Sequence, residues 1–379
     1  MPENEFGDIM LGMIIGVPKE IKADEYRVSL VPVGVEALRK SGHKIIVEKG
    51  AGLGSGITDR DYHEAGAEIL SSPRDIYRKA DMIIKVKEPL EAEYDLLRPG
   101  QIVFTFFHFA ASEILTRAMV QRKIIAIAYE TIETDKGAIP PLIPMSEVAG
   151  RMAVQEGAKY LEKPMMGKGI LLGGVPGVPP ANVVIIGGGV VGSNAAKIAA
   201  GLKARVTILD VNLDRLRYLD DIMPSNVITM MSNSYNIREK LKEADLLIGA
   251  VLIPGARAPV LVTRKMLKLM KPGSVIVDVA VDQGGCVETI KPTTHQKPVY
   301  IIDNIVHYGV ANMPGAVAGT STYALTNATI PYALDIANKG YKKAARENKA
   351  IMRGINMVEG KVTLRPIAEQ YRFKYHTLN

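Results

Sequence analysis

The fold of this chain is decided by the stretch Asn182-Val-Val-Ile-Ile-Gly-Gly-Gly-Val-Val-Gly192, followed by Ser-Asn-Ala-Ala-Lys-Ile-Ala-Ala-Gly-Leu202. Its β-branched residues are typical of a buried parallel strand, and the later small residues favour a helix. Gly187, Gly189 and Gly192 match G-x-G-x-x-G. In that spacing the glycines permit a tight turn, the approach of a pyrophosphate and close helix–strand packing. The stretch therefore predicts a dinucleotide site whose phosphates face a helix N-terminus.

The next predicted strand, Arg205–Asp210, ends in an acid. A carboxylate at this place can accept hydrogen bonds from the adenosine ribose and repel a 2′-phosphate, which favours NAD over NADP. A glycine-rich turn that serves only close packing would show the same spacing. The strand, turn, helix, second strand and terminal acid together favour the dinucleotide interpretation.

Length and composition indicate two domains, because 379 residues with 47% hydrophobic composition exceed one ordinary core. Cys286 is the single cysteine, so no intrachain disulfide can form, and a reducing, cytoplasmic location is expected. The apolar run Ile9–Val17 follows acidic residues where a signal peptide requires basic ones. No apolar stretch approaches the roughly 20 residues of a membrane helix, so we expect no membrane partner.

The formal charge of +7 raises the possibility of nucleic-acid binding. The basic residues of the C-terminal tail, from Lys339 to Arg353, have the spacing of a solvated helix face, so no nucleic-acid partner is expected. A modest positive field also attracts a carboxylate substrate and an anionic dinucleotide.

Strand and helix patterns alternate along most of the chain. The expected strands are Met13–Val17, Lys44–Glu48, Asp81–Val86, Gln101–Phe107, Ile124–Tyr129, Val183–Ile186, Arg205–Asp210, Val227–Met230, Leu246–Ala250 and Ser274–Val279. The helical patterns between the first five are Val33–Ser41, Asp59–Ala67, Ser72–Lys79 and Ser112–Gln121. This alternation predicts an α/β protein with two doubly wound, Rossmann-like parallel-sheet domains.

The second domain is expected to be an insertion in the first. Ser146 is predicted to cap a helix that reaches about Glu162 and leads into the glycine-rich strand. The helical pattern Ser321–Ile336, interrupted at Pro331, and the basic tail helix follow a complete dinucleotide fold, so they are expected to return to the first domain. The predicted domains are residues 1–140 plus 319–379 for the substrate and residues 141–318 for NAD.

Four side chains lie at or after the carboxyl ends of expected strands of the first domain, where ligands of open α/β sheets bind. They are Arg27, Lys85, Lys87 and His108. Each has another interpretation: Arg27 as a surface-loop residue, the two lysines as a solvated strand face, and His108 as a hydrogen-bonded core residue. Cations and an imidazole at neighbouring strand ends are what a small carboxylate with a proton to exchange requires.

In the second domain Asp282 follows an expected strand and either faces the ligand cleft or forms the turn before Gly284. Cys286 has no neighbouring histidine or basic pair in sequence to activate it, which argues against a nucleophile. No metal site is expected, because the histidines are scattered singly and no H-E-x-x-H motif occurs.

Several separated motifs occur along the chain: Gly16-Val-Pro-Lys-Glu-Ile-Lys22 with Glu25-Tyr-Arg-Val28, Lys85-Val-Lys-Glu-Pro89, Phe104-Thr-Phe-Phe-His108, Pro144-Met-Ser-Glu-Val-Ala-Gly-Arg151, Asp282-Gln-Gly-Gly-Cys286 and Val310-Ala-Asn-Met-Pro314. In this order they resemble the motifs of bacterial L-alanine dehydrogenases, in the family that includes the transhydrogenase α-subunit. The resemblance implies NAD-dependent, reversible oxidative deamination of L-alanine to pyruvate and ammonium by a cytoplasmic homo-oligomer, usually a hexamer.

The resemblance also implies residue roles. Arg27 and Lys87 would hold the substrate carboxylate and carbonyl, His108 would be the acid/base, and Asp282 would assist it. The residues expected to line NAD, including the fingerprint glycines, are Ser146, Gly187, Gly189, Val190, Val191, Gly192, Asp210, Arg215, Ser232, Val251, Leu252, Val279, Ala280, Val281, Asp282, Lys291, Val310, Ala311, Asn312 and Met313.

Two alternatives stay open at this point. A transhydrogenase α-subunit has the same fold and glycine motif but requires a membrane partner. A sensor that binds NAD or nucleic acid without turnover would give no NADH from alanine, and its binding to DNA would weaken steeply with salt.

Overall fold

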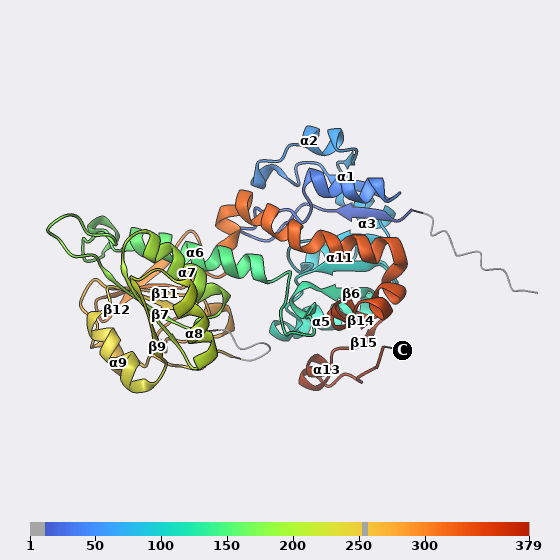
Figure 1. Ribbon diagram of the computed structural model, residues 1–379. Coiled ribbons are helices and arrows are strands. Elements are labelled where there is room, and N and C mark those ends of the chain that lie inside the picture. The colour runs from blue at the N-terminus through green and yellow to red at the C-terminus, as the bar shows by residue number, and fades with distance from the viewer. Residues whose placement is uncertain (1–11, 252–256, 379) are drawn as a thin grey trace, which may run out of the picture. The chain divides into compact units, whose positions relative to one another are not determined.

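The computed structural model describes residues 12–251 and 257–378. The chain folds as two compact units: Met1–Met145 with Val317–Asn379 form the first, and Ser146–Ala316 form the second. Each contains a twisted sheet with helices on its faces, as the ribbon shows (Figure 1). The protein therefore has the predicted fold class, two Rossmann-like α/β units with one inserted in the other.

The first unit contains an eight-stranded sheet in the order β15-β14-β6-β5-β4-β1-β2-β3. Its strands are β1 Ile14–Val17, β2 Lys44–Glu48, β3 Glu68–Leu70, β4 Met82–Ile84, β5 Ile102–Thr105, β6 Ile125–Ala128, β14 Ile355–Val358 and β15 Lys361–Val362. The strands from β1 to β6 pair in parallel, whereas β14 pairs antiparallel with β6 and β15 antiparallel with β14. The predicted parallel sheet thus ends in an antiparallel edge, because the tail of the chain returns as a short hairpin.

Side-chain alternation along these strands builds two cores. Ile45 and Val47 of β2 face one core, in which helix residues such as Leu325 are buried, and Ile46 faces the other. The helices of the unit are α1 Pro32–Lys40, α2 Asp59–Glu64, α3 Pro73–Lys79, α4 Glu91–Tyr94, α5 Glu113–Arg122, α11 Ala318–Glu347, α12 Lys349–Gly354 and α13 Arg365–Tyr371. A strand has a side-chain period of two, so both of its faces can be buried.

The predicted interruption at Pro331 is wrong. Helix α11 continues through Pro331, and its non-helical residue is Gly340, with φ 72° and ψ 152°. This backbone region is essentially restricted to glycine, so Gly340 sets the place where the helix bends.

The second unit contains a seven-stranded sheet in the order β12-β13-β11-β10-β7-β8-β9. Its strands are β7 Asn182–Ile186, β8 Arg205–Asp210, β9 Val227–Met231, β10 Leu246–Gly249, β11 Val275–Asp278, β12 Val299–Ile302 and β13 Ile305–Tyr308. All pairs are parallel except β12 with β13. The antiparallel edge was again not predicted.

The helices of the second unit are α6 Ile143–Tyr160, whose first three residues belong to the first unit, α7 Val190–Gly201, α8 Leu213–Ile222, α9 Ser234–Glu243 and α10 Arg264–Leu267. Ser146 does not cap α6, because the helix begins at Ile143. The second helical residue is Pro144, and proline is common in a first helical turn, where a backbone N–H has no intrahelical partner. Ser146 therefore lies inside the helix.

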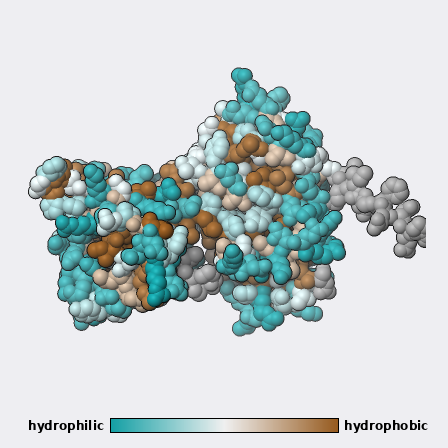
Figure 2. All heavy atoms as spheres, viewed as in Figure 1, coloured by the Kyte–Doolittle hydropathy of each residue, from teal (hydrophilic) through white to brown (hydrophobic). Residues whose placement is uncertain are grey.

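The surface visible in the space-filling view is mostly hydrophilic, with hydrophobic residues in small groups (Figure 2). Within residues 12–251 and 257–378, no helix combines the length and apolarity that crossing a bilayer requires.

Candidate active site

In the first unit, the order of the strands brings together three loops that carry predicted site residues. β1 lies between β2 and β4, because the chain returns from β3 to the other side of β1. The carboxyl ends of β1, β4 and β5 are therefore neighbours, and they lead to Arg27, Lys87 and His108. Ligands of open α/β sheets bind at such a switch point.

Arg27 is not a surface-loop residue, since only 3% of it is exposed. Its guanidinium makes a fork-to-fork pair with Glu25, with Nε to Oε1 at 2.7 Å and Nη2 to Oε2 at 2.6 Å. Nη1 donates to Sδ of Met145 at 3.0 Å. A guanidinium has five N–H donors, so the pair with Glu25 fixes its plane without using all of them.

Lys85 does not belong to a solvated strand face, because it is 1% exposed. Its Nζ lies 3.2 Å from Oε2 of Glu20 and 2.8 Å from Oε1 of Glu93. Burial acts to lower the pKa of Lys85, but the two carboxylates outweigh it and the net shift is upward. Lys85 is therefore a buried structural cation.

Lys87 is half-buried, and within the described part of the chain its ammonium has no hydrogen-bond or ion-pair partner. Burial, followed by the positive charges of Arg27 and Lys22, lowers the pKa of Lys87. Removing a cation from water without a partner costs free energy, which an incoming anion would recover.

His108 is exposed, so the core interpretation of this residue is also wrong. Its backbone is left-handed, with φ 51° and ψ 43°, which is uncommon for a residue with a side chain. Glu130, at the carboxyl end of β6, holds this turn by accepting hydrogen bonds from the N–H groups of Phe107 at 3.2 Å and His108 at 2.5 Å. The ring stacks on Phe106, with centroids 5.6 Å apart. Strain of this kind is concentrated at functional sites.

A cavity of about 300 Å³ lies beside the loop that follows β1. Its lining includes the charged side chains of Lys19, Glu20, Lys22, Glu25 and Arg27. The cavity therefore adjoins the fixed guanidinium on the loop after β1.

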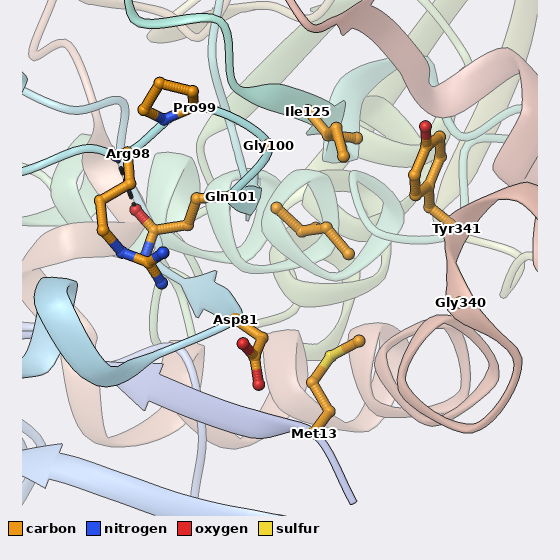
Figure 3. A pocket seen from close by; sticks show the side chains of 10 residues that line it. Met13, Asp81, Arg98, Pro99, Gly100, Gln101, Ile125, Gly340 and Tyr341 are labelled. Atoms are coloured by element: carbon orange, nitrogen blue, oxygen red, sulfur yellow. Dashed lines mark hydrogen bonds between the residues drawn. The ribbon is translucent and has the colours of Figure 1, made fainter. Parts of the chain in front are cut away.

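A second cavity, of about 290 Å³, lies at the opposite ends of the same strands, with Met13 before β1 and Asp81 before β4 (Figure 3). Its buried Gln101 donates to the carbonyls of Tyr77 and Ala80 and accepts from the N–H of Arg98. None of the predicted site residues lines this cavity. It is at the amino ends of the strands, away from the switch point.

In the second unit, the fingerprint glycines have the geometry that a dinucleotide requires. Gly187 has φ 103°, and a Cβ on Gly192 would lie 1.8 Å from the carbonyl oxygen of Gly187. A Cβ on exposed Gly189 would have no atom within 4 Å. The space beside Gly189 leaves the N-terminus of α7 open to a pyrophosphate.

Asp210 and Arg215 flank this glycine loop. Asp210 accepts from the N–H of Gly188 at 2.6 Å and from that of Asn212 at 2.8 Å. Arg215 donates through Nε to the Gly188 carbonyl at 2.5 Å, and its guanidinium lies over the Tyr218 ring. The acid that would face a ribose is therefore fixed, with a cation next to it.

Asp282 is exposed, on the short 3-10 helix η5, Val281–Gln283. The loop that carries it closes around Asp278, which accepts from the N–H groups of Ala280 at 3.0 Å, Cys286 at 2.7 Å and Val287 at 3.0 Å. Cys286 is fully buried, and burial together with Asp278 raises the pKa of its thiol, so it does not have the properties of a nucleophile.

The other residues expected to line NAD mostly follow carboxyl ends of the same sheet. Ser232 follows β9, Val251 follows β10, Val279, Ala280 and Val281 follow β11, and Val310–Met313 follow β13. Val190 and Val191 begin α7, and Lys291 lies with its ammonium 4.6 Å from the centroid of the Tyr300 ring. Ser146 is half-buried in the first turn of α6, and Leu252 lies outside the described residues.

Five acids that fix these loops were not among the predicted site residues: Glu20, Glu25, Glu93, Glu130 and Asp278. Glu130 and Asp278 stand at strand ends, where the rule that selected His108 also applies. Glu20 follows β1, so the same rule could also have selected it. Glu93 lies in α4 and had no comparable signal, because its role depends on the burial of Lys85.

The chain is similar over nearly its whole length to alanine dehydrogenases. Residues 16–149 match the family described as Alanine dehydrogenase/PNT, N-terminal domain, and residues 153–365 match its C-terminal domain. Alanine dehydrogenase of Methanococcus maripaludis is 60% identical over 96% of this chain and 98% of its own, and that of Bacillus subtilis is 57% identical over 96% of both. A solved L-alanine dehydrogenase is 50% identical, with a TM-score of 0.92 over 95% of this chain and 99% of its own. A solved transhydrogenase from Sinorhizobium meliloti is 27% identical, with a TM-score of 0.78 over 92% of this chain and 98% of its own.

Proposed function

Since the chain belongs to the Alanine dehydrogenase/PNT family and is an NAD-dependent amino-acid dehydrogenase, we propose that it catalyses the reversible oxidative deamination of L-alanine to pyruvate and ammonia. The observation that carries the proposal is the half-buried Lys87 ammonium, which has no partner among the described residues and whose pKa is lowered by burial and by Arg27. A small carboxylate would supply the missing negative charge.

Arg27 and Lys87 would bind the carboxylate and the carbonyl oxygen of the substrate. The planar guanidinium, fixed by Glu25, presents directed donors to a carboxylate, and the Lys87 ammonium acts as a point charge on the carboxylate and the pyruvate carbonyl. Both residues lie in the first unit, so we assign substrate binding to that unit and cofactor binding to the second.

His108 would transfer the protons. During oxidation it accepts a proton from the water that adds to the imine carbon, and it returns a proton to the departing amine. The imidazole is accessible because His108 is exposed, and Glu130 fixes the position of the His108 backbone. Asp282 would assist by stabilising the imidazolium.

NAD, when bound, would supply the hydride-transfer chemistry for Cα of the substrate. Gly187, Gly189 and Gly192 would hold its pyrophosphate, and Asp210 its adenosine ribose. The other residues expected to line NAD are proposed for the rest of the dinucleotide on the same grounds. We further propose a cytoplasmic homo-oligomer, with a hexamer as the assembly implied by the family resemblance.

The likeness to the Sinorhizobium meliloti transhydrogenase supports one other candidate, a transhydrogenase-type subunit that would require a membrane partner. The purified chain should be given alanine and NAD, then a panel of other amino acids, and in reverse pyruvate, ammonium and NADH. Sustained NADH formation from alanine by the chain alone is expected. Its absence would reject the proposed function and favour the transhydrogenase-type subunit.

A further inference from the structure

Glu20 contacts the backbone of Lys87 directly. Oε1 of Glu20 accepts hydrogen bonds from the N–H of Val86 at 2.6 Å and from the N–H of Lys87 at 3.2 Å. Glu20 follows β1 and Lys87 follows β4, so this carboxylate joins the two loops at the switch point. One oxygen atom thus holds two consecutive amide groups.

The other oxygen of Glu20 is held by a buried charge cluster. Oε2 lies 3.2 Å from the Lys85 ammonium, which lies 2.8 Å from Glu93. Glu93 also accepts from the Tyr77 hydroxyl at 2.7 Å and from the N–H of Leu90 at 2.8 Å. Because a buried charge pair holds its geometry closely, Glu20 has little freedom to move away from the two amides.

The carbonyl of Lys87 is held as well. It accepts a hydrogen bond at 2.9 Å from the hydroxyl of Thr105, a fully buried residue of β5. The backbone of Lys87 is therefore fixed on its N–H side by Glu20 and on its C=O side by Thr105, whereas its ammonium has no partner within the described residues. This arrangement directs the ammonium without neutralising it.

We propose that Glu20 is a positioning residue for Lys87: its carboxylate, anchored by Lys85, fixes the turn after β4 and so sets where the Lys87 ammonium meets the substrate carboxylate. The proposal rests on the proposed function, because it assigns substrate binding to Lys87. What matters is the reach of the Glu20 oxygen to the two amides, and its negative charge has the lesser part. When Glu20 is replaced by an uncharged residue, the ion pair between Lys85 and Glu93 remains, and its net charge is zero.

Two conservative variants separate reach from charge. Glu20→Gln keeps an oxygen at the same distance along the side chain and removes the charge. Glu20→Asp keeps the charge and withdraws the oxygen by one methylene. Pyruvate KM, kcat and NADH affinity should be measured for both. We expect Glu20→Asp to raise the pyruvate KM at least about 10-fold, because misplacement of a binding group by about 1 Å can cost up to about 10²-fold. Glu20→Gln keeps an oxygen for the two amides but turns an NH2 donor toward the Lys85 ammonium, so its pyruvate KM should rise less than that of Glu20→Asp without staying at the wild-type value. NADH affinity should be unchanged in both.

Asp245 provides a matched control. It is a buried carboxylate that also joins a lysine, Lys168, to a backbone N–H, that of Asn182, but at the amino ends of strands in the second unit. Asp245→Asn should lower thermal stability without changing the pyruvate KM. A general loss of stability in the Glu20 variants would then be recognised by comparison of their melting temperatures with that of the control.

Lys87→Ala should be measured alongside. If Lys87→Ala raises the pyruvate KM while Glu20→Asp does not, or if Glu20→Gln is impaired as much as Glu20→Asp, the positioning role of Glu20 is rejected and the substrate site stands. If Lys87→Ala leaves the KM unchanged, the substrate assignment itself is wrong and the positioning role falls with it.

Discussion

At the scale of single residues, His108 combines exposure with a strained backbone, and removal of its imidazole should stop proton transfer. His108→Ala is expected to lose about 10²–10⁴-fold in kcat, the usual contribution of a general acid or base. NADH affinity, measured by fluorescence, should stay near that of the wild type, because the fingerprint glycines belong to the other unit. A variant with more than about half of the wild-type rate would contradict the role of His108.

Because of Lys87, the affinity for pyruvate should fall at alkaline pH. Burial and neighbouring cations lower its pKa, so the ammonium loses its proton below the ordinary value of about 10.4. The anion requires the charged form, and affinity should therefore fall as pH rises through this lowered pKa. Pyruvate affinity of the NADH-loaded enzyme should be titrated without ammonium, which itself changes charge in this range. Lys87→Arg should abolish the alkaline loss, and a flat wild-type profile up to about pH 10 would be the contrary result.

Asp210 should determine the choice between NAD and NADP. Its carboxylate is fixed by two backbone N–H groups and would face a 2′-phosphate of like charge. We expect a preference for NAD of at least about 10²-fold in kcat/KM, or roughly 2.7 kcal/mol. Asp210→Ala should lose most of it, while Arg215 would partly offset the repulsion. Equal use of both cofactors by the wild type would remove Asp210 from the ribose site.

At the scale of elements, Gly340 determines the bend in α11. Its φ of 72° and ψ of 152° belong to a region that a side chain makes costly, by about 1–3 kcal/mol. Gly340→Ala should lower the free energy of unfolding by about this amount in chemical denaturation. The control is Gly201→Ala, since a Cβ on Gly201, which lies in α7 with negative φ, would have no atom within 4 Å. Equal stability of Gly340→Ala and the wild type would show that the bend does not depend on glycine.

Elements with strong local signals were predictable. Strands such as β2 and β8 occupy the expected residues, because β-branched runs bounded by turns identify buried parallel strands. The hairpin of β14 and β15 is not apparent from the sequence, because the pairing of Ile355 with Ile127 depends on a partner far away in sequence. α6 starts before the expected Ser146 cap, because Pro144 fits the first turn of a helix, although serine is a favoured cap residue.

The sequence predicts which candidate site residues lie at strand ends. It does not predict the buried carboxylates that hold those loops in place. A strand followed by Arg27, Lys87 or His108 can be identified from the sequence, and the topology then brings these loops together. The pairing of Lys85 with two carboxylates could not be predicted, because only burial distinguishes this lysine from Lys87 two residues later. Residue spacing does not report that burial.

At the scale of the whole molecule, we expect the subunits to assemble as a hexamer. The segment between α6 and β7 exposes several large apolar side chains, among them Leu171 at 69% and Val178 at 58%. Contact with other subunits would remove such groups from water. Sedimentation equilibrium should give six times the subunit mass of 41.1 kDa, and a concentration-independent monomer would contradict the hexamer.

The insertion of the second unit has a consequence for synthesis on the ribosome. Domains generally fold as units, and the N-terminal part usually comes first. Here the second unit, Ser146–Ala316, is complete before the first one can be, because β14 pairs with β6 only after Ile355 has been translated. Until then the outer edge of β6 remains an open template for pairing with other nascent chains. A pause or truncation after Ala316 and before Ile355 should therefore produce aggregates that contain a folded, NAD-competent second unit.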